Sequence, residues 1–381
     1  MKRFFLLTLA SAALLGASAA PVKTYEVKSP DGRLALVLTA GERLSFTVAR
    51  DGETLVAPSE MALTLSTGEV LGESPRVRSA RRRAVTETID APLYRQSRFD
   101  AAYNEFDLRL RGDYGILARA YDDGVCYRFY TERDGELTIV DETAQLNFEG
   151  DPSAYIPYSK TEIPMRTSFE NTYEYAPLSK FRTQTVAFMP VLVDLGERGY
   201  VLYTESDVEA YPGVYLTYDK EAKGFAARFA ECPTETSLTK RFQDVVERSA
   251  DYIARVDGRR SYPWRIVAYA ATATELPVND MVWQTAEASR VADASWVRDG
   301  KIAWDWWNNW GVYGVDFKSG INTETYKYFI DFAAANGIEY VALDFHCSDT
   351  EAPNVTFPAV SHAMLPEAIA RALVNNPDIL L

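Results

Sequence analysis

Short runs in which apolar and polar residues alternate fill the chain from about residue 22 to 272. In 44–48 the alternation is strict, Asp51-Gly52 follows, and 54–56 begins a second run. Alternation with period two predicts strands with one buried face, and Asp-Gly between two such runs predicts a tight hairpin turn. We expect another turn at Asp134-Gly135, where the pattern recurs. About 250 residues of this kind predict a large antiparallel β-sandwich.

A different period begins in the last third of the chain. Residues 301–308 predict an aromatic strand, and 323–336 carry apolar residues at i, i+3, i+4 and i+7, which predicts a helix that Gly337 caps. The apolar run 338–343 predicts a second strand, buried on both sides. A strand, a helix and a strand with short joints form a βαβ unit, whose two strands are parallel. We therefore expect an α/β domain over 296–381.

The boundaries of the expected fold are a sandwich domain at 22–275, a linker at 276–295 with a short helix within 281–292, and the α/β domain. A closed eight-stranded (β/α)8 barrel takes roughly 200 residues or more, so the α/β domain holds only the first strands and helices of one. We therefore expect a multi-domain β plus α/β chain with a truncated barrel.

Charge and composition exclude several classes of protein. The formal net charge is −14, so nucleic acid is not an expected partner. The only basic run is Arg81-Arg82-Arg83, which we interpret as a solvated strand or loop. No stretch after the N-terminus is long and apolar enough for a membrane span.

The N-terminus predicts export. Lys2-Arg3 precedes the apolar run 4–15, and the small residues 16–19 follow it. This order is typical of a secretory signal peptide, which we place at 1–19 with cleavage after Ala19. No cysteine follows near the cleavage point, so we expect a soluble periplasmic or extracellular protein rather than a lipoprotein.

Cysteine and histidine are too scarce for most metal or nucleophile chemistry. Cys126, Cys232 and Cys347 have no metal-ligand spacing, and we interpret them as small buried side chains. His346 and His362 are the only histidines, which disfavours a zinc site. A His346–Cys347 nucleophile pair is disfavoured because neighbouring strand residues point to opposite faces.

Four tryptophans lie within the seven residues 304–310, interleaved with Asp and Asn. A strand alternates its faces, so these indoles cannot all point inward, and some must lie at its carboxyl end. Indole rings stack on the apolar face of a sugar while polar side chains bind its hydroxyls. A plug of aromatic core between two domains explains the same composition equally well.

Short motifs in both regions occur in the order found in one known enzyme family. In the sandwich region they are 121–129 (YDDGVCYRF), Thr204-Glu205, 211–213 and 263–265, and in the α/β region 301–308, 314–317, 326–333 and 336–341. Over about residues 23–341 these motifs resemble glycoside hydrolase family 97, whose sandwich carries a YxDGxxYRF pattern.

The resemblance implies an exported α-glucosidase or α-galactosidase that cleaves α-linked oligosaccharides. Its fold is a β-super-sandwich followed by a (β/α)8 barrel, with a calcium ion bound by glutamates. Glu170 matches the position of a calcium ligand from the sandwich, with Glu174 as a nearby competitor. The positions that match substrate-binding residues are Trp306, Trp307, Asn308 and Asp344.

Glycosidic cleavage needs two carboxyl groups. The family's lie on later barrel strands, so the catalytic residues are unknown and expected beyond Leu381. After Asp344 the residues 345–349 depart from the family pattern, in which a small residue and a tryptophan follow.

The alternative to a glycoside hydrolase is a non-catalytic carbohydrate-binding protein or a degenerate remnant. A mutarotase-like enzyme is disfavoured because the sandwich lacks histidine. Glucoside or galactoside, retention or inversion, and the oligomeric state stay open.

Overall fold

The structure is a computed structural model that describes residues 22–91, 94–160, 165, 169, 171–238 and 244–342. It contains two compact units. The sandwich unit is Met1–Cys232 with Ala250–Glu287, and the α/β unit is Pro233–Ser249 with Ala288–Leu381. The predicted signal peptide at 1–19, together with Glu170, Asp344 and Cys347, lies outside the described residues.

The described part of the sandwich unit contains eighteen strands that join in one network of antiparallel ladders. The strands are β1 (Lys23–Lys28), β2 (Leu34–Ala40), β3 (Leu44–Arg50), β4 (Glu53–Leu65), β5 (Val70–Leu71), β6 (Val77–Asp90), β7 (Arg98–Leu110), β8 (Tyr114–Tyr121), β9 (Gly124–Ala144), β10 (Leu146–Asn147), β11 (Ser153–Ile156), β12 (Glu174–Pro177), β13 (Val191–Asp194), β14 (Tyr200–Ser206), β15 (Val214–Asp219), β16 (Gly224–Phe229), β19 (Ala254–Ser261) and β20 (Trp264–Ala270). The predicted large antiparallel sandwich is therefore confirmed.

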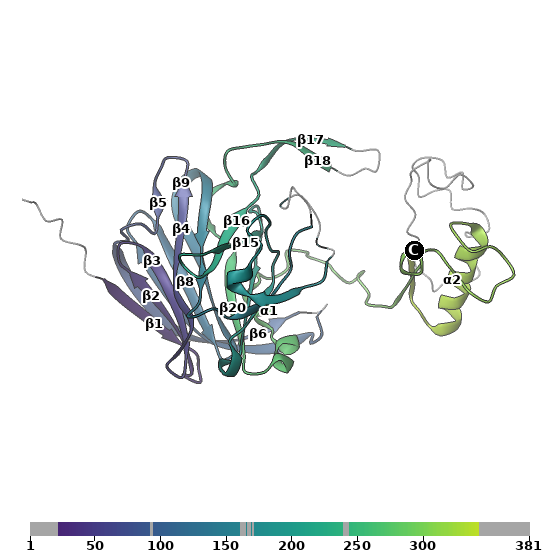
Figure 1. Ribbon diagram of the computed structural model, residues 1–381, viewed down its shortest axis with the longest axis horizontal. Coiled ribbons are helices and arrows are strands. Elements are labelled where there is room, and N and C mark those ends of the chain that lie inside the picture. The colour runs from purple at the N-terminus through teal and green to yellow at the C-terminus, as the bar shows by residue number, and fades with distance from the viewer. Residues whose placement is uncertain are drawn as a thin grey trace, which may run out of the picture. The chain divides into compact units, whose positions relative to one another are not determined.

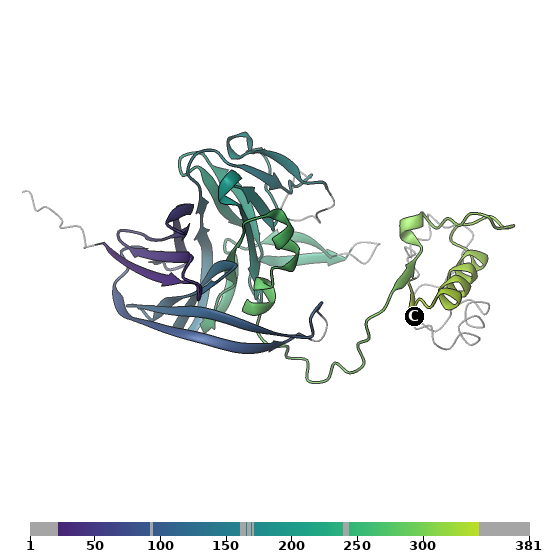
Figure 2. The same cartoon turned by 90° about the horizontal axis from the view of Figure 1, so that it is seen from below.

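Strand β9 is the longest strand and joins most of the network (Figure 1). Its first half pairs with β8 and β20, its middle with β19, and its end with β4. The larger of two apolar clusters in the described sandwich has fully buried side chains that include Leu36, Phe46 and Ile116, and the smaller one contains Trp264 and Met281. Figure 2 shows the long blue hairpin of β6 and β7, on which Arg81-Arg82-Arg83 is exposed as expected.

The two predicted Asp-Gly turns have different outcomes. Asp51 and Gly52 both have positive φ, 50° and 88°, and connect β3 to β4 as predicted. Asp134-Gly135 is not a hairpin turn, because β9 continues through it and forms a bulge opposite Gly258 of β19. A Cβ on Gly258 would lie 2.6 Å from the carbonyl oxygen of Arg133, so only glycine fits opposite the extra residues.

The segment that follows β20 is only briefly helical. A 3-10 helix, η4, covers Ala273–Val278, and α1 covers Met281–Thr285. The helix expected within 281–292 is therefore shorter than the apolar pattern suggested, and residue 286 is already extended.

No helix in the described ranges has the length and apolar character needed to cross a membrane. Cys126 is buried as expected, whereas Cys232 is half-buried.

In the α/β unit, β21 (Ile302–Trp304), α2 (Thr323–Asn336) and β22 (Tyr340–Ala342) form the predicted βαβ unit, with the two strands parallel. Asn322 caps α2 by accepting from the Thr325 amide, and Gly337 ends the helix with φ of 63°. The strand expected at 301–308 is shorter, since η5 (Trp306–Asn308) replaces its second half. The unit also holds the hairpin of β17 (Pro233–Leu238) and β18 (Asp244–Ser249), whose side chains are mostly exposed.

The Asp51-Gly52 turn gives a test of the sandwich. A Cβ added to Gly52 would meet no atom within 4 Å, so Gly52→Ala introduces backbone strain alone. We expect the substitution to lower the free energy of unfolding by about 1 kcal/mol. Gly41→Ala is the control, because the φ of Gly41 is not positive and its Cβ would meet Val22 at 3.5 Å, an ordinary contact. Urea unfolding followed by far-ultraviolet circular dichroism measures both, and equal effects would contradict the assignment.

Candidate saccharide site and the exit segment of the sandwich

The tryptophan-rich segment lies at the carboxyl edge of the parallel pair of strands. Trp304, the last residue of β21, is in register with Ala342, the last residue of β22. In α/β folds with parallel strands, the loops that follow the carboxyl ends carry the binding and catalytic groups. The segment 305–310, which we call the tryptophan turn, is therefore where a site of this fold belongs.

The backbone of the tryptophan turn is tightly folded. The carbonyl oxygen of Asp305 accepts hydrogen bonds from the amides of Asn308, at 3.2 Å, and Trp310, at 3.0 Å. Asn309 and Trp310 both have left-handed φ values, 51° and 52°. This region is unfavourable for a bulky residue such as tryptophan, and such strain is concentrated at functional sites. Asp305 itself is completely buried, which anchors the turn.

The folded turn presents its rings to solvent within the α/β unit. Trp307 is 77% exposed and Trp306 is 40% exposed. Asn308, the next residue along the turn, is exposed as well. The rings pair edge to face, Trp304 with Trp307 at 5.8 Å and Trp306 with Trp310 at 5.0 Å. The apolar core of this unit is formed by other residues of α2 and β22. These rings are therefore not part of the α/β unit's own described core.

The YDDGVCYRF motif has a structural role that its sequence did not reveal. Residues 279–287, which we call the exit segment, are the last of the sandwich unit, and the motif holds them in place. The Asn279 side chain donates to the Asp123 carboxylate at 2.9 Å and to its carbonyl oxygen at 3.1 Å. Gly124 packs against Met281 so closely that a Cβ would lie 2.1 Å from the Met281 sulfur.

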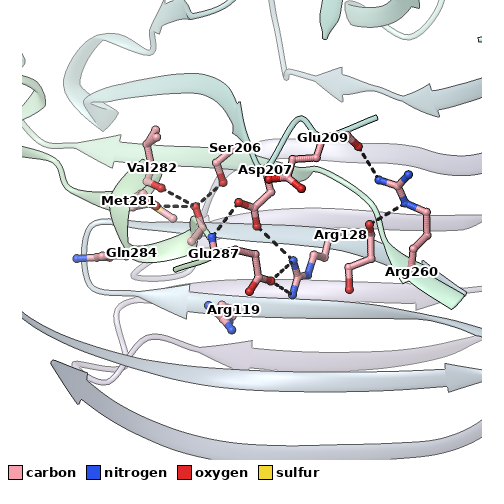
Figure 3. Close-up of polar contacts among 12 residues, drawn as sticks. Arg119, Arg128, Ser206, Asp207, Glu209, Arg260, Met281, Val282, Gln284 and Glu287 are labelled. Carbon is pink, nitrogen blue, oxygen red and sulfur yellow. Dashed lines mark hydrogen bonds and ion pairs between the residues drawn. The ribbon is translucent and has the colours of Figure 1, made fainter. Parts of the chain in front are cut away.

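Arg128 of the same motif fixes the end of the exit segment (Figure 3). Its guanidinium donates to Glu287 at 3.2 Å and to Asp207 at 3.5 Å, while Asp207 accepts from the Glu287 amide at 2.9 Å. Arg128 also lies over the ring of buried Trp264, 4.4 Å from its centroid. One cation is thus held by two carboxylates and an aromatic face.

The tip of the β6–β7 hairpin binds the exit segment too. The Tyr94 hydroxyl donates to Asp280 at 2.7 Å, and Arg95 donates to the same carboxylate at 2.6 Å. The rings of Tyr94 and Trp283 stack with centroids 4.4 Å apart. The path of the exit segment is therefore fixed by residues that lie far from it in the sequence.

The other sandwich motifs meet in the buried core. Arg265 is 1% exposed and pairs with Glu142 at 2.7 Å and with Glu205 at 2.6 Å. Glu205 also accepts from the Val214 amide at 3.0 Å, which positions the preceding Tyr-Pro-Gly motif at 211–213. Burial raises the pKa of Glu205, and the Arg265 charge opposes this shift. This triad links three strands.

A metal site is not formed by the described residues. Within these ranges, no group of three or more His, Cys, Asp or Glu side chains could hold an ion. Glu170, the expected calcium ligand, lies outside them, while Glu174 pairs with Arg182 at 2.6 Å. Of the expected substrate-binding residues, η5 brings Trp306, Trp307 and Asn308 together.

Comparisons with known proteins agree with this architecture. The model of the glycosyl-hydrolase 97 N-terminal domain matches residues 27–287, and the model of glycoside hydrolase 97 matches residues 306–362. The chain belongs to glycoside hydrolase family 97.

Its relatives include a retaining α-galactosidase of Bacteroides thetaiotaomicron, 39% identical over 330 residues, which cover 84% of this chain and 50% of the relative. A probable retaining α-galactosidase of Streptomyces bingchenggensis is 29% identical over 83% of this chain and 44% of its own length. The chain thus spans about half the length of the curated relatives it matches.

Solved structures share the fold. A family 97 enzyme from Pseudoalteromonas sp. strain K8 in complex with acarbose has a TM-score of 0.68 at 19% identity, covering 83% of this chain and 46% of that one. A β-arabinopyranosidase has a TM-score of 0.65 at 20% identity, covering 83% of this chain and 50% of its own.

The Asp123 contact predicts a pH dependence. Burial raises the pKa of Asp123 to about 6, so the folded chain binds more protons than the unfolded chain between about pH 4 and 6. The free energy of unfolding contributed by Asp123 therefore falls as pH rises through this range. Asp123→Asn should flatten that fall, because an amide does not titrate, and its oxygen can still accept from Asn279. Asp122→Asn removes only a minor charge that raises the pKa of Asp123, so it should keep the fall; a profile as flat as that of Asp123→Asn would refute the assignment.

Proposed function

We propose that the protein hydrolyses α-galactosides with retention of configuration, when its chain has the length of its relatives. The observation that supports this most is the tryptophan turn, whose exposed rings lie at the carboxyl edge of the parallel strands in a family 97 chain. The 39% identity to a retaining α-galactosidase favours a galactoside over a glucoside. The pattern of residues 1–19 favours export.

Each residue of the turn has a distinct task in this proposal. The exposed faces of Trp306 and Trp307 stack on the apolar face of a sugar ring, and the Asn308 amide binds its hydroxyls. Asp344, two residues past the end of β22 in the sequence, is the acidic position assigned to sugar binding. Retention needs two carboxyl groups about 5–5.5 Å apart, one as acid and one as nucleophile. Neither is assigned among the described residues.

The second candidate is a carbohydrate-binding protein without catalysis. It needs only the tryptophan turn, whose exposed Trp306 and Trp307 rings can bind a sugar without catalytic carboxyl groups. An assay of sugar release from an α-galactoside separates the two, and we expect the purified 381-residue chain to release none. Release by this chain would refute the placement of the catalytic groups.

Both candidates require saccharide binding at the tryptophan turn, which can be measured directly. Trp307→Ala removes the most exposed ring of the turn, and we expect it to weaken the affinity for an α-galactosyl oligosaccharide about tenfold. Trp296→Ala is the control, because Trp296 is 75% exposed but lies outside the turn. Isothermal titration calorimetry compares the variants, and unchanged affinity in Trp307→Ala would refute the assigned site.

We propose further that Glu170 contributes one carboxylate to a calcium ion. Calcium takes six to eight oxygen ligands, so one carboxylate alone binds weakly and the ion needs further oxygen atoms beside those of Glu170. When bound, the ion would supply positive charge that stabilises developing negative charge.

The calcium proposal is tested without an activity assay. Calcium that binds the folded chain should raise the Tm, by about 2 °C for a modest site. Glu170→Gln should remove this rise, while Glu174→Gln should keep it, since Glu174 pairs with Arg182 instead. A calcium-dependent Tm that survives Glu170→Gln, or no dependence in the parent chain, would be evidence against the ligand.

A further inference from the structure

Two exposed tyrosines pair on the surface of the sandwich unit, on two strands that hold no residue of the exit segment. Tyr155 of β11 and Tyr175 of β12 are direct partners in the antiparallel ladder. Their ring centroids are 4.6 Å apart, yet Tyr155 is 40% exposed and Tyr175 is 54% exposed. The strand register therefore holds two aromatic rings side by side at the solvent boundary.

Polar groups border this pair on the same face of the sheet. Ser153 is in register with Asp194 of β13, and it lies two residues from Tyr155, so it shares the face of Tyr155. The Asp194 carboxylate accepts from the Tyr175 hydroxyl at 2.9 Å and from the Gly196 amide at 2.9 Å. The carboxylate is thus fixed by two donors at the edge of the rings.

The chemistry of this face fits one class of ligand. Paired tyrosine rings offer an apolar surface with a polar edge, which suits the C–H face of a pyranose, and fixed oxygen atoms suit its hydroxyls. An acidic ligand is disfavoured by the Asp194 carboxylate and by the net charge of −14. The complementary ligand is therefore a neutral saccharide.

We propose that Tyr155, Tyr175 and Asp194 form a second binding site for neutral saccharide, which we call the tyrosine platform. This inference rests on the proposed saccharide function and adds a site in the sandwich unit to the tryptophan turn of the α/β unit. The rings stack on one sugar unit, and the free lone pairs of Asp194 accept from its hydroxyl groups. Such a site retains an oligosaccharide or polysaccharide without taking part in its cleavage.

The test uses the 381-residue chain in a Trp307→Ala background, so that binding at the tryptophan turn is reduced. Titration with a neutral α-galactosyl oligosaccharide then reports the tyrosine platform. We expect Tyr155→Ala and Tyr175→Ala each to weaken the remaining binding about tenfold, and Tyr175→Phe, which keeps the ring, to weaken it less. Tyr252→Ala is the control, because Tyr252 contacts Arg255 elsewhere on the sandwich.

The outcomes separate the two proposals. Unchanged residual binding in both alanine variants, with a Tm equal to that of the parent, would overturn the tyrosine platform and leave the tryptophan turn intact. A parent chain that binds no saccharide would overturn both. If the alanine variants change the sedimentation coefficient and not saccharide binding, the face is a protein interface and the tyrosine platform is wrong.

Discussion

The contact between Gly124 and Met281 is the constraint on which the end of the sandwich unit depends. An added Cβ at Gly124 would lie 2.1 Å from the Met281 sulfur and 2.8 Å from the Cα of Ala268, so β9 has no room for a side chain between α1 and the backbone of β20. Around this contact, Asp123 fixes the start of the exit segment and Arg128 fixes its end. One strand therefore determines both the core of the sandwich and the path by which the chain leaves it.

The buried charges of the sandwich serve the same end. Burying Arg265 with Glu142 and Glu205 carries a desolvation penalty that its ion pairs must offset, so such a triad is weak evidence for stability. Its geometric effect is clearer, because it joins β9, β14 and β20 at one point. In this protein we infer that the triad specifies how these strands align. The family motifs of the sandwich thus describe architecture rather than chemistry.

Local sequence signals predicted local structure well. Helix α2 begins and ends where its apolar stripe and Gly337 place it, and the Asp51-Gly52 turn forms as expected. The Asp134-Gly135 prediction was wrong because a bulge depends on the partner strand, and the short-range pattern contains no information about Gly258. The strand over 301–308 was too long because its aromatic content does not distinguish a strand from the 3-10 helix η5, which begins at Trp306.

The candidate site was predictable only in part. Four tryptophans in seven residues indicated a site, but their exposure follows from the tryptophan turn, which the sequence did not predict. The role of Asp123 and Arg128 needed the fold, since their partners in the exit segment lie more than 150 residues away. The tyrosine pair was missed entirely, because Tyr155 and Tyr175 become neighbours only through the ladder of β11 and β12.

A crystal structure of the chain with a bound α-galactosyl oligosaccharide tests the central claim most directly. The account predicts a sugar ring stacked on the exposed face of Trp306 or Trp307, with the Asn308 amide within hydrogen-bond distance of a hydroxyl group. A sugar bound elsewhere while these rings pack against protein would contradict it.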